Sequence, residues 1–185
     1  MPLIDTHTNI WDVSKHMSEK FLEETRRARS DPTSMEMDVG RFESAMEPCD
    51  GVIAFGLKFA HTGIDVPNDF VADFIRQIDD PKIIPWMSVD PNNNTYMDEF
   101  EHARVDLKMH GVKLGPIYQN VDPRDSRLHP LYRECTKHNL PILFRTGTTF
   151  CQDAPLRYSR PHLWDEVATM FPDLVMILAH MSHPW

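Results

Sequence analysis

Residues 83–89 read IIPWMSV, a short apolar run that lacks strict polar alternation. Runs of this kind are typical of strands that are buried on both faces of a sheet. Working outward from it in both directions, five more segments share its length and character. They are Leu3–Ile10, Gly51–Leu57, Gly111–Leu114, Pro141–Phe144 and Leu174–Ala179. The sequence therefore predicts six buried strands.

Helical patterns occupy the segments between these runs. In Asn68–Ile78, apolar residues recur at helical spacing. The other predicted helices are Lys15–Arg29, with Ser14 as its expected N-cap, Val39–Glu47, Thr95–Met109, Leu131–His138 and His162–Phe171. Prolines stand at the boundaries of these segments, where they do not interrupt a helix.

Alternation of buried strands and helices indicates a parallel sheet with crossover helices, either an open doubly wound sheet or a barrel. An open sheet normally carries a glycine-rich GxGxxG turn after its first strand, and this chain, with seven glycines, has none. We predict an α/β fold, a (β/α)8 TIM barrel, with residues 1–185 as one domain. Only the first six strand-helix units are present and the last two are missing. Because a full barrel needs about 200–250 residues, we expect the natural protein to be longer.

Composition narrows the class of partner. The formal net charge is -9, and no long basic run is present, so we expect neither nucleic acid nor a membrane surface as a partner. The three cysteines have no CxxC spacing, which fits a reducing compartment. No apolar stretch approaches a membrane span or a signal peptide. We expect a cytoplasmic protein that binds a small molecule, and a homo-oligomer is compatible with the sequence.

Polar residues stand where the predicted strands end, and the reactive residues of a parallel barrel gather there. Asp5, His7 and Asn9 alternate along the first strand and so share one face. A polar row on an otherwise apolar strand must hydrogen-bond inward or bind a ligand, so we predict a functional role for it. His180 ends the last apolar run, and we predict a role for it as well.

Two cationic residues end other strands. Arg145 follows a buried strand, where its planar guanidinium suits a substrate carboxylate. A salt bridge to Asp5 or Asp153 explains the same residue equally well. Lys113, in the fourth strand, is either the partner in a buried ion pair or a residue that binds the substrate.

Four segments resemble a known family: Ile4-Asp5-Thr6-His7, HGVKLGPIYQNVDP (110–123), HPLYRECTKHNLPILFRTGTT (129–149) and RPHLWDEVATMFPDLVMILAHMSHPW (160–185). They are similar to amidohydrolase-related proteins, in the branch of that superfamily that includes aminocarboxymuconate-semialdehyde decarboxylase. The resemblance implies a distorted (β/α)8 barrel with one divalent metal, usually zinc. It also implies metal ligands from an HxH motif on the first strand, a histidine on the fifth and an aspartate on the eighth, with an acid/base histidine on the sixth.

Carried over residue by residue, the resemblance makes His7 the first metal ligand and His180 the acid/base. Asn9 stands in the place of the second ligand histidine, and Arg145 in the place of the histidine on the fifth strand. An amide oxygen is a poorer zinc ligand than imidazole, and a guanidinium repels a dication. We therefore predict that zinc or another divalent metal is bound weakly or not at all.

Our first hypothesis is an amidohydrolase-like enzyme that acts on a small carboxylate-bearing substrate. Hydrolysis of a lactone, ester or amide is favoured over decarboxylation, because decarboxylation in this family depends on the metal. Arg145 and Lys113 would bind the substrate, His180 would transfer a proton or activate water, and Trp11 and Trp185 would form the pocket walls.

Two alternatives stay open. One is a non-catalytic relative that serves as a binding or structural subunit, since it would lack two metal ligands. The other is a conventional metal enzyme in which Asp5 and His7 act as a carboxylate-histidine pair, with metal-dependent decarboxylation as its reaction.

Overall fold

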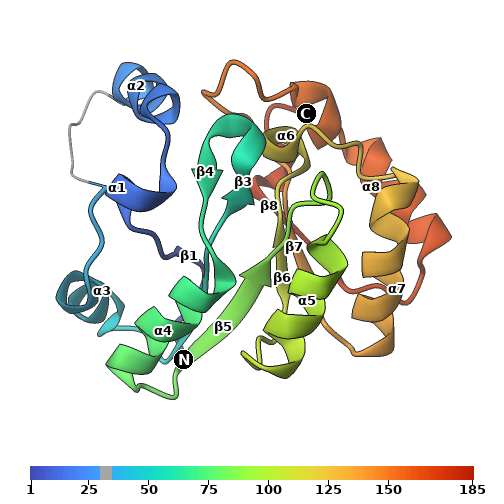
Figure 1. Ribbon diagram of the computed structural model, residues 1–185. Coiled ribbons are helices and arrows are strands. Elements are labelled where there is room, and N and C mark those ends of the chain that lie inside the picture. The colour runs from blue at the N-terminus through green and yellow to red at the C-terminus, as the bar shows by residue number, and fades with distance from the viewer. Residues whose placement is uncertain (30–34) are drawn as a thin grey trace.

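The protein is described by a computed structural model, which describes residues 1–29 and 35–185. Its main feature is a six-stranded sheet in the order β1-β2-β5-β6-β7-β8, in which neighbouring strands run parallel (Figure 1). The strands are β1 (Ile4–Asn9), β2 (Gly51–Phe55), β5 (Ile83–Ser88), β6 (Val112–Leu114), β7 (Ile142–Arg145) and β8 (Met176–Ala179). Each of the six apolar runs that predicted a strand contains one.

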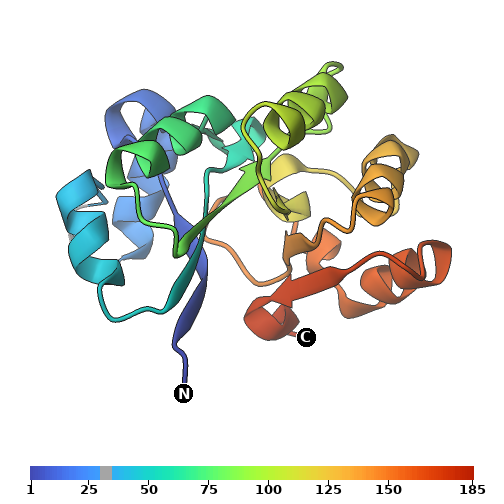
Figure 2. The same ribbon diagram turned by 90° about the horizontal axis from the view of Figure 1, so that it is seen from below.

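Helices surround the curved sheet, as Figure 2 shows from below, and α6 lies at the carboxyl end of the strands (Figure 1). They are α1 (Val13–His16), α2 (Glu19–Ala28), α3 (Val39–Met46), α4 (Asn68–Ile78), α5 (Tyr96–Val105), α6 (Pro116–Gln119), α7 (His129–Lys137) and α8 (Pro161–Met170). Six parallel strands with helices outside them form a partial TIM barrel, which confirms the predicted fold class. The strands β1 and β8 are the two edges of the sheet.

The predicted helix Lys15–Arg29 is wrong in one respect, because the structure divides this segment. Met17 is extended and forms an isolated antiparallel bridge with Ile64, which separates α1 from α2. Each half then has its own N-cap. Asp12 accepts a hydrogen bond from the backbone N–H of Ser14, and Ser18 accepts one from that of Phe21. Ser14 is therefore not the N-cap that the sequence suggested.

A small antiparallel hairpin lies above the end of β2, and the sequence did not predict it. It consists of β3 (Lys58–Phe59) and β4 (Ile64–Asp65), which a 3₁₀ turn joins (Figure 1). The turn closes at Gly63, whose φ of 90° favours glycine. Two-residue strands give too short a hydrophobic period to be detected from sequence.

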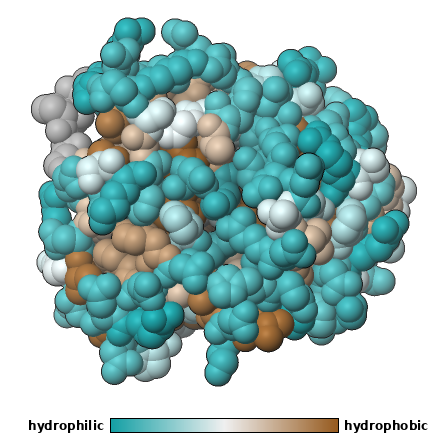
Figure 3. Space-filling view, viewed as in Figure 1, coloured by the Kyte–Doolittle hydropathy of each residue, from teal (hydrophilic) through white to brown (hydrophobic). Residues whose placement is uncertain are grey.

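The core is formed by the inner residues of the sheet and the helices that pack on it, and most of its large side chains are fully buried. On the face seen in Figure 3 the surface is mostly hydrophilic, with scattered apolar patches. Apolar exposure includes the edge strands, where Ile4 is 55% exposed and Ile177 and Leu178 are each 40% exposed. Among the described residues, no helix has the length and apolar character needed to cross a membrane.

Candidate active site

Residues from the carboxyl-terminal halves of three strands line one small cavity of about 50 Å³. His7 and Asn9 come from β1, Lys113 comes from β6, and Arg145 ends β7. The walls are completed by Leu57, Phe59, Ile64 and Tyr118. The structure thus brings together four of the side chains that the sequence singled out, and none of the eight lining residues is an acid.

His180 lies beside this cavity, in the 3₁₀ turn His180–Ser182 that follows β8. Its ring centroid is 5.2 Å from that of His7, and its Nε2 accepts a hydrogen bond of 2.9 Å from Nη1 of Arg145. Because the guanidinium can only donate, the neutral imidazole of His180 carries its proton on Nδ1. The turn is backbone-strained, since His180, Met181 and Ser182 all have φ between 48° and 65°.

Gly147 allows the turn after β8 to approach the loop after β7. A Cβ at this position would lie 2.6 Å from Cβ of His180. Any larger residue would therefore displace the histidine from the guanidinium of Arg145. This is a close backbone approach that only glycine permits.

Lys113 is the most deeply buried charged residue in the cavity, with 1% of its surface exposed. Its Nζ lies 3.3 Å from Nε2 of His7 and 5.2 Å from the ring centroid of Phe55. Burial, and secondarily the charge of Arg145, lower the pKa of this amine well below its usual range. Within the described part of the chain, these contacts of Nζ are with His7 and Phe55, and neither partner is a carboxylate.

Both histidines are held in their neutral form. The pKa of His7 is lowered to about 3, first by burial and then by the charges of Lys113, His180 and Arg145. The pKa of His180 is lowered to about 4, first by burial and then by Arg145 and Lys113. At neutral pH these rings can accept a proton but carry no charge of their own.

The guanidinium of Arg145 is fixed by contacts that include no carboxylate among residues 1–29 and 35–185. Its Nη2 donates to the backbone oxygen of Thr148 at 2.8 Å, and its Cζ lies 5.0 Å from the ring centroid of Tyr118. Its buried Nε has no hydrogen-bond partner among the described residues. The oxygen Oδ1 of Asn9 is likewise buried without a partner in the described structure.

In the described structure, Arg145 forms no salt bridge with Asp5 or Asp153, the two acids that the sequence suggested as partners. Asp5 uses its Oδ1 to accept a hydrogen bond from the backbone N–H of His7, at 2.8 Å, and Asp153 pairs with Lys20. Each of the two proposed partners is therefore engaged elsewhere. The same contact places the carboxylate of Asp5 on the backbone rather than on the ring of His7.

The two tryptophans are not among the residues that line the cavity. The indole N–H of Trp11 donates to the backbone oxygen of Met35, and that of Trp185 donates to Oγ of Ser159. The aromatic walls come instead from Phe59 and Tyr118, whose rings stack with centroids 5.4 Å apart. Sequence analysis missed Phe59, because the hairpin that carries it was not predicted.

The donor set does not fit a divalent metal. His7 and Asn9 are the two residues that the resemblance placed as ligands, but Lys113 and Arg145 face the same space. The charge of Arg145 raises the electrostatic cost of a dication there. The described residues also contain no group of three or more His, Cys, Asp or Glu side chains arranged to hold a metal. We therefore assign neither His7 nor Asn9 as a metal ligand.

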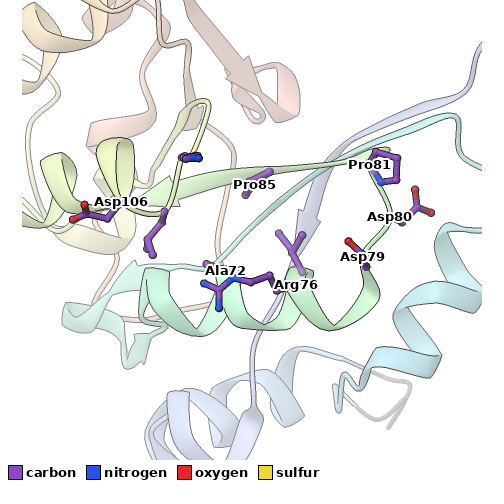
Figure 4. Close-up of a pocket in the computed structure, with 10 residues that line it drawn as sticks. Ala72, Arg76, Asp79, Asp80, Pro81, Pro85 and Asp106 are labelled. Atoms are coloured by element: carbon purple, nitrogen blue, oxygen red, sulfur yellow. The ribbon is translucent and has the colours of Figure 1, made fainter.

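A larger hollow of about 450 Å³ lies at the opposite end of the sheet, near the amino end of β5 (Figure 4). Its charged residues are of both signs, and they are Arg76, Asp79, Asp80, Asp106 and Lys108. In parallel barrels the chemistry occurs at the carboxyl end and the amino end serves stability. The small cationic cavity is therefore the candidate active site.

A partial TIM barrel with a polar site at the carboxyl ends of its strands defines the structural class of this protein. The model of the amidohydrolase family matches residues 4–185, and the chain belongs to that family. No curated protein matches the chain. The fold is shared with several solved structures.

One of these is an uncharacterized TIM-barrel protein from Bordetella bronchiseptica, with a TM-score of 0.76 and 22% identity over 100% of this chain and 69% of that one. Another is a mutant 5-carboxyvanillate decarboxylase from Novosphingobium aromaticivorans with bound manganese, with a TM-score of 0.69 and 14% identity over 98% and 66% of the two chains. A third is IDCase from Metarhizium anisopliae, with a TM-score of 0.63 and 14% identity over 98% and 65%. This chain spans about two thirds of the length of these structures.

Proposed function

We propose that this protein is an amidohydrolase-type enzyme that hydrolyses a lactone, ester or amide of a small carboxylic acid. The observation that carries the proposal is the guanidinium of Arg145, which lies beside the buried amine of Lys113 in a cavity that no acid lines. Keeping such groups inside a protein costs stability unless an anion joins them. A carboxylate matches this need in charge, and it also matches the planar guanidinium of Arg145 in shape.

The guanidinium is pre-positioned to bind such an anion. Tyr118 lies under it, and the carbonyl of Thr148 accepts one of its N–H groups. The buried Nε of Arg145 still has a donor to offer. Contacts that fix a side chain before binding reduce the entropy lost when the ligand binds.

His180 is our candidate for the general base, because its lowered pKa of about 4 leaves it neutral at physiological pH. Its Nε2 is engaged by Arg145 in the free protein, and a bound carboxylate would compete for that guanidinium. We propose that substrate binding releases Nε2 to take a proton from water. His7 and the free oxygen of Asn9 would orient this water.

The residues present do not fit a resident metal, so no step of this mechanism passes through one. The substrate is a small molecule. The three cysteines are free in the structure, and with them we propose the cytoplasm as the compartment.

A panel of lactones, esters and amides that carry a free carboxylate tests the proposal. We expect activity on at least one compound, lost in His180→Asn and in Arg145→Ala while circular dichroism shows an intact fold. A matched control is Arg124→Ala, since Arg124 pairs with Asp122 and Glu166 away from the cavity. Absence of hydrolysis across the panel, together with no binding of any small acid, would favour the non-catalytic alternative.

A further inference from the structure

In the hydrolysis proposed above, Lys113 only lines the cavity beside Arg145. Its burial and its contacts indicate a further chemical role. A lysine with 1% exposure and no acid in its cavity is costly to keep as an ammonium ion. As the neutral amine, the same group is a nucleophile toward carbonyl carbon. Its burial and its neighbour Arg145 favour that neutral form, which agrees with its lowered pKa.

The surroundings of Lys113 supply what such a reaction needs. Nε2 of His7 lies 3.3 Å from the amine, within reach of a proton transfer. Arg145 lines the same cavity and would hold a carboxylate there. Because Lys113 and Arg145 line the same cavity of about 50 Å³, a small ligand that meets both carries its carbonyl close to its carboxylate. An α-keto acid, in which the two groups are on adjacent carbons, is the smallest ligand of this kind.

We propose that Lys113 forms an imine with the carbonyl carbon of a small α-keto acid whose carboxylate is bound by Arg145. This inference rests on the carboxylate site of the proposed function and adds a second activity to it. It also names the substrate class for that activity.

The step is balanced without an oxidant or a reductant. The lone pair of Nζ forms the new C–N bond, and His7 passes a proton from the nitrogen to the carbonyl oxygen, giving a neutral carbinolamine. The hydroxyl takes one proton from solvent and leaves as water while the nitrogen lone pair forms the C=N bond. Amine, ketone and one proton thus become protonated imine and water. A protonated imine withdraws electrons from neighbouring bonds, so cleavage of a C–C bond next to it does not depend on a metal.

The imine can be trapped by reduction. The full chain is incubated with pyruvate, a ketone that reacts slowly with exposed lysines, and sodium cyanoborohydride, then analysed by intact mass and peptide mapping. We expect one reduced adduct per chain, located on Lys113. The adduct should be absent in Lys113→Met and Lys113→Arg, and its formation should slow by about tenfold or more in Arg145→Ala.

Lys58→Met is the matched control, since Lys58 is also partly buried but is paired with Asp65 and Glu99. This variant should keep the adduct on Lys113. Modification spread over surface lysines, or the same mass gain in a folded Lys113→Met variant, would refute the inference.

Lactate separates this inference from the proposed function, because it carries the carboxylate but has no ketone or aldehyde group that could form an imine. If lactate raises the melting temperature of the wild-type chain but pyruvate gives no adduct, the imine is excluded and the carboxylate site stands. If lactate binds and also slows adduct formation by competition, both are supported. If neither acid has any effect, both proposals fail.

Discussion

Two lysines, one in the β3-β4 hairpin and one in the main sheet, have opposite surroundings. Lys58, in β3, pairs with Asp65 at 2.9 Å and with Glu99 at 3.4 Å. Burial acts to lower its pKa, but these two carboxylates raise it above the usual range. Nζ of Lys113, in β6, contacts His7 and the ring of Phe55 but no carboxylate among the described residues, and its pKa is lowered.

The difference teaches how to distinguish a structural cation from a functional one in this fold. The charge of Lys58 is balanced by two carboxylates of the same chain, so Lys58 needs no bound anion. The guanidinium of Arg145 and the amine of Lys113 have no acid in the cavity that they line. Uncompensated polar groups in a cleft are typical of sites that bind or react.

The largest expected effect concerns Arg145. Replacing it by Ala removes a charge-assisted contact with the substrate, which contributes about 1.5–3 kcal/mol net and corresponds to about 10- to 100-fold in kcat/KM. Steady-state kinetics on the best compound of the panel measures this. Arg124→Ala should leave kcat/KM unchanged. Equal losses in both variants would indicate a general effect on folding rather than a role in the cavity.

The two lysines should respond oppositely to the same substitution. Lys58→Met leaves Glu99, whose side chain is 22% exposed, without its cation, so the free energy of unfolding should fall by about 1–3 kcal/mol. Lys113→Met replaces an unpaired buried amine by an apolar side chain of similar length, so it should leave that free energy unchanged or raise it. Urea denaturation of both variants measures the difference. A larger loss in Lys113→Met than in Lys58→Met would break the comparison.

The uncompensated cations also predict a pH dependence. The pKa of His180 is lowered from 6.5 to about 4, mainly by burial and then by Arg145. The neutral base therefore persists below pH 6.5, and kcat/KM should fall only near pH 4. In an NMR titration, Arg145→Ala should raise the pKa of His180 toward 6.5. An acidic limb near 6.5 in the wild-type protein would contradict the assignment of His180 as the base.

The same histidines affect stability in a defined direction. The folded-state pKa of His7 is about 3, below the value of 6.5 for a free histidine, so the unfolded chain binds more protons in this window. Stability is thus fully present above pH 6.5 and falls as the pH is lowered toward 3. Urea midpoints measured across this range should decline, and less steeply in His7→Asn.

The smallest expected effect is that of a chelator. Because Lys113 and Arg145 face the space where a dication would lie, treatment with EDTA should change neither the melting temperature nor the hydrolysis rate. Elemental analysis of the purified chain checks the same point. Stoichiometric zinc, lost together with activity on chelation, would instead favour the conventional metal enzyme.

Sequence alone was sufficient for the sheet, because six buried strands leave continuous apolar runs that need no tertiary information. It also identified His7, Lys113 and Arg145, since polar residues that end apolar strands are conspicuous. It could not decide whether Arg145 has an acid partner, because Asp5 and Asp153 are committed by contacts that only the folded chain reveals. Nor could the sequence show that Trp11 and Trp185 are not among the residues that line the cavity, because their positions depend on how the chain folds.

Isothermal calorimetry of the wild-type chain with lactate tests the central claim most directly. An Arg145 guanidinium with no acid in its cavity predicts saturable binding of one acid per chain, weakened by about tenfold or more in Arg145→Ala and unchanged in Arg124→Ala. No heat of binding, or binding that Arg145→Ala leaves intact, would contradict it.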